Sequence, residues 1–173
     1  NAGKFKPLQN FVVVKPDDRL KSYGNLILPD TVNLKPDYGT IISVGPGTIE
    51  FPMDARIGDH VNFDKSRAIE IVIDESIHYV VFSQHLIYRG SIDEILHPMN
   101  EFVLLEYNEP KRKIIAHTKE HHDDNFVKGK VIKLSRKHFP FKETQDVLFN
   151  LKYAFIWNHK RNNSLLIRSE HIV

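Results

Sequence analysis

Cysteine is absent from the 173 residues of this chain, which rules out disulfides, cysteine-ligated zinc and thiol nucleophiles. Long apolar runs are also lacking, since the longest spans the five residues Tyr153–Trp157, against the roughly 20 that a membrane helix needs. The chain also lacks a large excess of either charge, because 24 Lys and Arg residues are balanced by 22 Asp and Glu residues, a net charge of +2. That balance argues against attachment to nucleic acid or to an acidic membrane by charge alone. We therefore expect a soluble protein with no membrane contact.

Helical patterning is also lacking, because no stretch of a dozen residues keeps an apolar stripe of helical period without Gly or Pro. The first half instead contains short segments that are β-branched or alternate between polar and apolar residues, as half-buried strands do. Turn signals lie between them, and the turn at Asp74-Glu75-Ser76 predicts a hairpin. A small all-β barrel or sandwich follows from this pattern. The predicted strands are Phe11–Val14, Thr40–Val44, His60–Asp64, Ile69–Ile73 and His78–Phe82.

An internal repeat is present, because four segments of the first half recur in the same order in the second. The offset between matched segments is 91, 90, 86 and 86 residues, so it shrinks only where loops would shorten. We therefore predict two copies of one β-domain, residues 1–90 and 91–173, joined by roughly residues 89–97. The matched pairs are Pro7–Val14 with Pro98–Leu105, Gly39–Val44 with Gly129–Leu134, Val61–Asp64 with Val147–Asn150, and Ser83–Ile87 with Ser169–Val173.

Four motifs of the first copy point to a family. Lys6-Pro7-Leu8 precedes the first strand, Gly24-Asn25-Leu26-Ile27-Leu28-Pro29 lies in the following loop, Gly39–Gly47 forms a strand and turn, and Arg56–Val61 leads into the next strand. In this order they resemble the GroES family, the small co-chaperonins that cap chaperonin cages. The resemblance implies an all-β fold, here as two tandem GroES-like β-barrel domains. Two copies in one chain are similar to the tandem chloroplast form of the family, and some viruses also encode divergent members.

The loop motif departs from the family in one position and has no close match in the second copy. Asn25 stands where the family has a second glycine. The counterpart in the second copy, Glu109–Lys128, contains Lys113-Ile114-Ile115-Ala116 with no glycine or proline beside it. We expect the second copy to be retained structurally and to have lost the binding function of its loop.

The loop itself is about 22 residues long, between the strands ending near Lys15 and starting near Tyr38. Loops of that length in compact domains are usually functional or disordered, and exposed aliphatic residues in them need a partner surface such as a hydrophobic groove. Three buried aliphatic side chains would contribute about 6 kcal/mol against an ordering cost of about 2–5 kcal/mol, so one loop binds weakly and several on one ring bind strongly. The alternative is that the triplet is another buried strand. The predicted chaperonin-binding residues are Gly24, Asn25, Leu26, Ile27, Leu28 and Pro29.

The resemblance implies a protein without catalytic residues, cofactor or bound metal. Its partners would be a large GroEL-like chaperonin ring, the encapsulated client proteins and further copies of the chain. A heptamer is favoured, because only the first copy keeps the loop motif and a sevenfold partner would then meet seven loops. Three or four chains with both copies alternating is the other arrangement. The expected location is the cytoplasm, that of the host for a viral protein, or an organelle stroma.

Other patterns have competing interpretations. Three His and two Asp between His117 and Asp124 could bind a metal ion, but a solvated polar loop is favoured. His60, His78 and His85 are expected to be structural. A GroES-like barrel also occurs in medium-chain alcohol dehydrogenases, but this chain lacks a dinucleotide fingerprint and Cys/His zinc ligands. The remaining alternative is a β-domain that binds nucleic acid or another partner through a basic face of the second copy, although a solvated face is favoured. That face would comprise Lys111, Arg112, Lys113, Lys128, Lys130 and Lys133.

Overall fold

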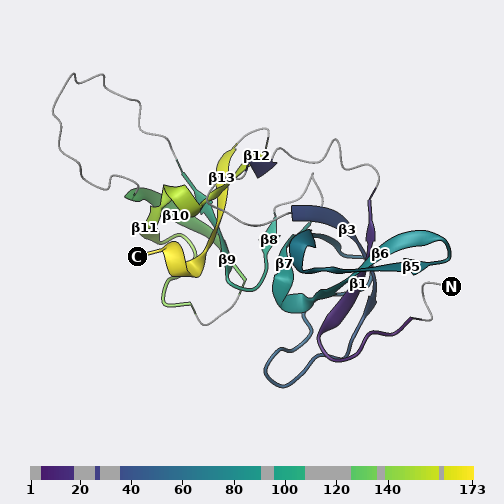
Figure 1. Ribbon diagram of the computed structural model, residues 1–173. Coiled ribbons are helices and arrows are strands. Elements are labelled where there is room, and N and C mark those ends of the chain that lie inside the picture. Colours follow the sequence, from purple (N-terminus) through teal and green to yellow (C-terminus); the bar gives the residue numbers. More distant parts are fainter. Residues whose placement is uncertain are drawn as a thin grey trace.

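The computed structural model describes residues 5–17, 26–27, 36–90, 96–107, 126–135, 139–159 and 162–173. These residues form β-strands and short 3-10 turns, arranged in two antiparallel sheets that lie side by side (Figure 1). None of the helical turns in the described ranges is long and apolar enough to cross a membrane.

The first sheet has the strand order β5-β6-β1-β3-β4-β7-β8. Its strands alternate between residues that enter a core and residues on the outer face, and the core is apolar: Val12, Val14, Ile41, Val61, Phe63 and Val81 are among its buried members. We call strands β1 and β3–β7 the first unit. The bounds are β1 (Phe11–Pro16), β3 (Pro36–Val44), β4 (His60–Asp64), β5 (Ile69–Ile73), β6 (Ser76–Phe82), β7 (Leu86–Arg89) and β8 (His97–Pro98).

The second sheet has the order β11-β10-β9-β13-β12-β2, and we call strands β9–β13 the second unit. Apart from β2, its order matches that of β4-β3-β1-β6-β5 strand for strand. A separate apolar core fills it, with Val103, Leu105, Val131, Phe149 and Ile167 fully buried. The bounds are β2 (Leu26–Ile27), β9 (Phe102–Glu106), β10 (Phe126–Leu134), β11 (Asp146–Asn150), β12 (Phe155–His159) and β13 (Asn162–Arg168).

Small irregularities also recur at equivalent positions of the two units. The pairing of β1 with β3 skips Ile42, and the pairing of β9 with β10 skips Ile132, its equivalent at the 90-residue offset. Gln9 and Asn100, equivalent at the offset of 91, both have a positive φ, of 50° and 56°. Because bulges and left-handed residues are uncommon, their recurrence indicates that the two units share one fold.

The side-chain caps of the two units match as well. The Asp64 carboxylate accepts a hydrogen bond from the Ser66 amide at 3.0 Å, and the Asn150 side chain accepts one from the Lys152 amide at 3.1 Å. Each starts the 3-10 turn that follows the third strand of its unit, β4 in the first and β11 in the second. An Asp-to-Asn change preserves the acceptor oxygen, so the turn is retained without the charge.

The predicted all-β fold with two tandem units is confirmed. Strands lie over all five predicted segments of the first half, and the predicted hairpin is formed by β5 and β6. Its turn residues Asp74 and Glu75 have φ values of 50° and 64°, as two-residue hairpin turns require. Pro16 is the last residue of β1, opposite Gly39.

Candidate functional site

The connection between β1 and β3 carries the predicted loop motif, and both of its ends are anchored. Lys15 and Pro16 pair with Thr40 and Gly39 in the sheet, and the Asp17 amide donates to the Tyr38 carbonyl oxygen at 3.4 Å. We call residues 17–35 the β1–β3 connection. It therefore leaves from and returns to a pair of adjacent strands.

Gly39 is required at the base of this connection. A Cβ at this position would overlap the Lys15 carbonyl oxygen and the Val14 side chain, because β1 and β3 approach closely there. Its equivalent Gly129 is confined too, since a Cβ would lie 2.7 Å from Phe149 Cε1. This close approach explains why Gly129 is the one glycine left in the second half of the sequence.

Two of the six predicted binding residues are placed by the structure. Leu26 and Ile27 form β2, which pairs in antiparallel fashion with β12 of the second unit, Ile27 opposite Ile156 and Leu26 opposite Trp157 (Figure 1). Two residues of the triplet therefore form a strand, as the alternative interpretation held, but this strand belongs to the sheet of the second unit. The sequence carries no signal for this long-range pairing. Gly24, Asn25, Leu28 and Pro29 lie outside the described residues.

The corresponding connection of the second unit lies almost wholly outside the described residues, including Lys113–Ala116 and His117–Asp124. Within the described ranges, no group of three or more His, Asp or Glu side chains is arranged to hold a metal ion. His78 is buried, with its Nδ1 3.0 Å from the Ser76 carbonyl oxygen, and His60 Nδ1 lies 3.1 Å from Thr40 Oγ1. These contacts fit the structural roles expected for both histidines.

The described part of the basic face on the second unit is interrupted by carboxylates. Lys130 pairs with Asp146 on one neighbouring strand and with Glu106 on the other. Together with Lys128 they line an open depression of about 580 Å³. Alternating charges reduce the positive potential that a nucleic-acid surface needs. Lys111, Arg112 and Lys113 are outside the described residues.

A junction joins the two units through backbone pairing. β7 of the first unit pairs with β8, Tyr88 opposite Pro98 and Arg89 opposite His97. The Asn100 side-chain amide donates to the carbonyl oxygens of Ser83 and Leu86, both at 2.8 Å. The chain between the units is thus tied to the end of the first sheet.

An apolar cluster fills the junction. It joins the outer face of the first unit, through Tyr38 and Tyr88, to the outer face of β9, β12 and β13. Tyr88 is fully buried, and burial raises the pKa of its hydroxyl far above the ordinary value. The buried members are Ile87, Tyr88, Leu96, Phe102, Leu104, Phe155 and Leu166. Burial of this many large apolar side chains fixes the second unit against the first.

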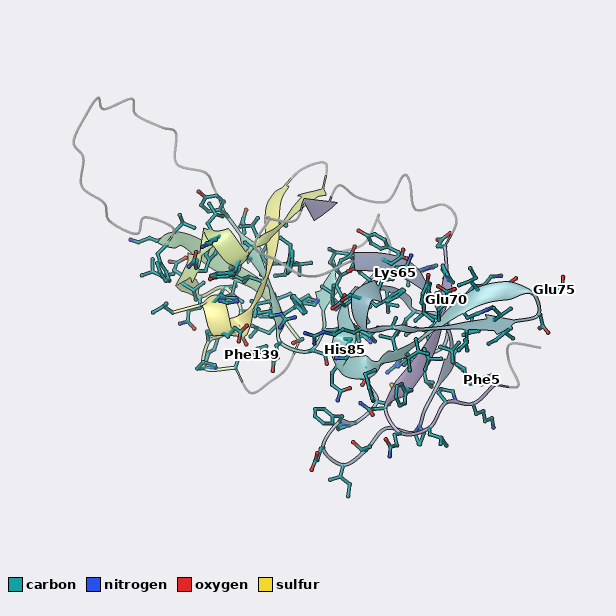
Figure 2. The ribbon with its side chains drawn as sticks, in the orientation of Figure 1. Phe5, Lys65, Glu70, Glu75, His85 and Phe139 are labelled. Carbon is teal, nitrogen blue, oxygen red and sulfur yellow. The ribbon has the colours of Figure 1, made fainter. Side chains whose placement is uncertain are left out.

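Charged groups surround the rim of the junction, where a cavity of about 220 Å³ lies between the units. His85 lies there, at the edge of the first unit (Figure 2). Burial, together with the nearby Arg67 and Arg168, lowers the pKa of His85, although Asp64 opposes the shift. Glu101 also lines this cavity. The rim therefore favours a neutral His85.

Comparison with known proteins identifies what the first unit resembles. The family model described as Chaperonin 10 Kd subunit matches residues 4–88, from before β1 into β7. Co-chaperonin GroES 2 of Bradyrhizobium diazoefficiens is 46% identical over 77 residues, which cover 41% of this chain and 74% of that protein. Co-chaperonin GroES of Gemmatimonas aurantiaca is 40% identical, covering 41% and 78% of the two chains. Co-chaperonin GroES of Pelagibacter ubique is 42% identical, covering 41% and 80%.

Proposed function

This chain belongs to the chaperonin 10 kDa (GroES) family, and on that premise we propose that it is a co-chaperonin that caps a large chaperonin ring. The aliphatic segment Leu26–Leu28, with Gly24, Asn25 and Pro29 around it, would bind apolar grooves on the ring and close the cage over client proteins. The energy for release would come from the nucleotide cycle of the partner, so this chain needs no catalytic group or cofactor for the role.

The single observation that carries the proposal is the position of this segment. It lies in the middle of the β1–β3 connection, within residues 4–88 matched by the family model. The connection is anchored at both ends by the pairing of β1 with β3. A long connection that presents aliphatic residues from a rigid base suits binding to a groove, because the scaffold supplies the position and the loop supplies the contact.

The chain is also proposed to assemble with further copies of itself. His97–Pro98 in β8 is the equivalent of Lys6–Pro7 at the 91-residue offset, and it pairs with the last strand of the first unit. The second unit thus sits where a neighbouring copy of the first could sit. Near the N-terminus the matching residue Pro7 is buried, while its neighbours Phe5 and Leu8 are 44% and 77% exposed. Contact of this N-terminal segment with the second unit of another chain would close a head-to-tail ring.

The junction bears on the number of chains. Seven chains would present seven loops to a sevenfold partner, as the sequence alone favours. In that arrangement β7 must pair with the next chain, yet here it pairs with β8 of its own chain. This favours a ring in which both units alternate, with three or four chains. We place the division between the repeats at residues 90 and 91, so β8 belongs to the second repeat by its match with Lys6–Pro7, although it completes the first sheet.

The test is capping by matched variants. Ile27→Asp would place a charge in an apolar groove, and burial of an unpaired charge costs several kcal/mol, more than one loop contributes. We expect this variant to lose co-sedimentation with a nucleotide-loaded chaperonin. Ile115→Asp, at the equivalent position of the second copy, should have a much smaller effect. Circular dichroism confirms that both variants are folded.

The opposite pattern would overturn the assignment. If Ile27→Asp still caps the chaperonin, or if Ile115→Asp is the damaging change, the binding loop is not the one in the first unit.

A further inference from the structure

We propose that the outer edge of β12 is a docking strand for the chain's own Leu26–Ile27 segment, and that the second unit thereby withholds this segment from the chaperonin. The effect on chaperonin binding rests on the proposed function, whereas the docking of the segment rests on the pairing of β2 with β12. Its occupant is a named segment of this chain, the strand β2.

β12 offers a sheet edge to which another segment can add as a strand. Within the second unit β12 is the outermost strand of the sheet, and it pairs with β13 on one side. Its equivalent β5 is the edge strand of the first sheet. Edge strands expose unpaired N–H and C=O groups and readily accept another strand. β2 satisfies part of that edge through antiparallel pairing at Ile156 and Trp157. The described residues place no strand beside the equivalent edge of β5.

The rest of the molecule holds this edge within reach. The junction cluster fixes β12 and β13 against the outer face of the first unit through Phe155, Leu166 and Tyr88. Nine residues separate β1 from β2, and eight separate β2 from β3. Extended segments of that length span at most about 30 Å, which allows docking without any movement of β1 or β3.

The docked state is expected to be weak and reversible. Two residues of strand pairing supply one or two backbone hydrogen bonds, enough to favour docking by roughly tenfold. Binding to the chaperonin would be weakened by the same factor, because only the undocked fraction is competent. In a ring of several chains the effect is multiplied, since each loop must undock to contribute to capping.

Docking and capping exclude each other because they use the same two residues. The backbone of Leu26 and Ile27 cannot pair with β12 while lying in a groove of another protein. This gives the second unit a role that does not require a binding loop of its own: it sets how readily the loop of the first unit is presented.

The experiment is a reversible lock. The chain has no cysteine, so Ile27→Cys combined with Ile156→Cys places a single thiol pair at directly opposite positions of β2 and β12. Opposite residues of antiparallel strands have Cβ atoms about 4.5–5.5 Å apart, close to what a disulfide needs. Ile27→Cys combined with Asn158→Cys is the matched control, because it is two residues out of register and beyond the ~7 Å Cα limit for a disulfide.

We expect the in-register pair to oxidise at least about tenfold faster than the control pair. The oxidised in-register variant should bind the chaperonin at least about tenfold more weakly than the same variant in its reduced form. Equal oxidation of the two pairs would overturn the docking. Rapid oxidation with capping unchanged would overturn the competition. If the wild-type chain does not bind a chaperonin at all, the proposed function fails, while the oxidation rates still decide the docking.

Discussion

The two units share a frame but differ in what they present on it. Strand order, the skipped residues at Ile42 and Ile132, and the capped turns are the same. The residues on the outer faces of the two sheets differ in what they contact. Asn62, on the outer face of the first unit, is completely buried between Tyr38 and Tyr88, whereas its equivalent Leu148 is 42% exposed. The frame follows from local rules for pairing and turns, so it survives divergence. The outer faces determine what each unit contacts, and they have diverged.

The largest expected difference concerns Phe102 and its equivalent Phe11. Phe102 is buried in the junction, with its ring centroid 5.9 Å from that of Phe155, whereas Phe11 is half-buried and stacks on Phe82. Phe102→Ala should lower the free energy of unfolding by about 3–5 kcal/mol, as for other buried phenylalanines, and Phe11→Ala by about 1–2 kcal/mol. Urea unfolding followed by circular dichroism and by the fluorescence of the single tryptophan, Trp157, measures both.

Equal losses for these two variants would contradict the comparison. They would mean that the junction contributes no more to stability than the outer face of the first unit.

A smaller difference is expected between the two confined glycines. Alanine at Gly39 would overlap the Lys15 carbonyl oxygen, which belongs to the backbone and cannot turn aside. At Gly129 the closest contact of an added Cβ would be the edge of the Phe149 side chain at 2.7 Å, and the nearest backbone atom, the Glu106 carbonyl oxygen, would be 3.1 Å away. Gly39→Ala should cost about 3 kcal/mol and Gly129→Ala about 1–2 kcal/mol, measured by the same urea titration. A larger loss at Gly129 would show that the second unit is the more tightly packed at this point.

The smallest effect is a pH dependence of stability that arises at His85 in the first unit. Because the pKa of His85 is lowered from its ordinary value of 6.5, the unfolded chain binds a proton at His85 that the folded chain does not. Stability contributed by this site is therefore present above pH 6.5 and is lost as the pH falls below it. The equivalent His171 has a different setting, 3.3 Å from the Glu170 carboxylate.

His85→Gln should flatten the slope of unfolding free energy against pH below 6.5 by a fraction of one proton. Urea midpoints between pH 5 and 7.5 provide the measurement. An unchanged slope in His85→Gln would place the pH dependence elsewhere.

Local pattern was enough to predict much of this fold. Alternation over Ile69–Ile73 and the turn signal at Asp74 gave the β5–β6 hairpin, because a hairpin is specified by neighbouring residues. The repeat was detectable because the same structural constraints retain similar residues in both units. The matched segments that begin at Gly39 and Gly129, for example, both start where two strands approach too closely for a side chain.

Contacts between the units were beyond prediction from the sequence. Phe102 and Leu104 read as alternating strand residues, and nothing in the pattern says that their face packs on Tyr88 rather than meeting solvent. The pairing of Ile27 with Ile156 joins residues 129 positions apart, and two-residue strands carry no periodicity. The candidate site could thus be predicted as a segment, but its contact with the second unit could not.

The mass of the intact assembly decides whether the second unit stands beside the first as a neighbour in one ring. Native mass spectrometry at micromolar concentration, with and without a chaperonin, measures it. We expect a species of three or four chains of 20.1 kDa each, and retention of that species on the chaperonin. A species of seven chains would place the second units outside the ring, and a monomer of 20.1 kDa would show that the chain forms no ring.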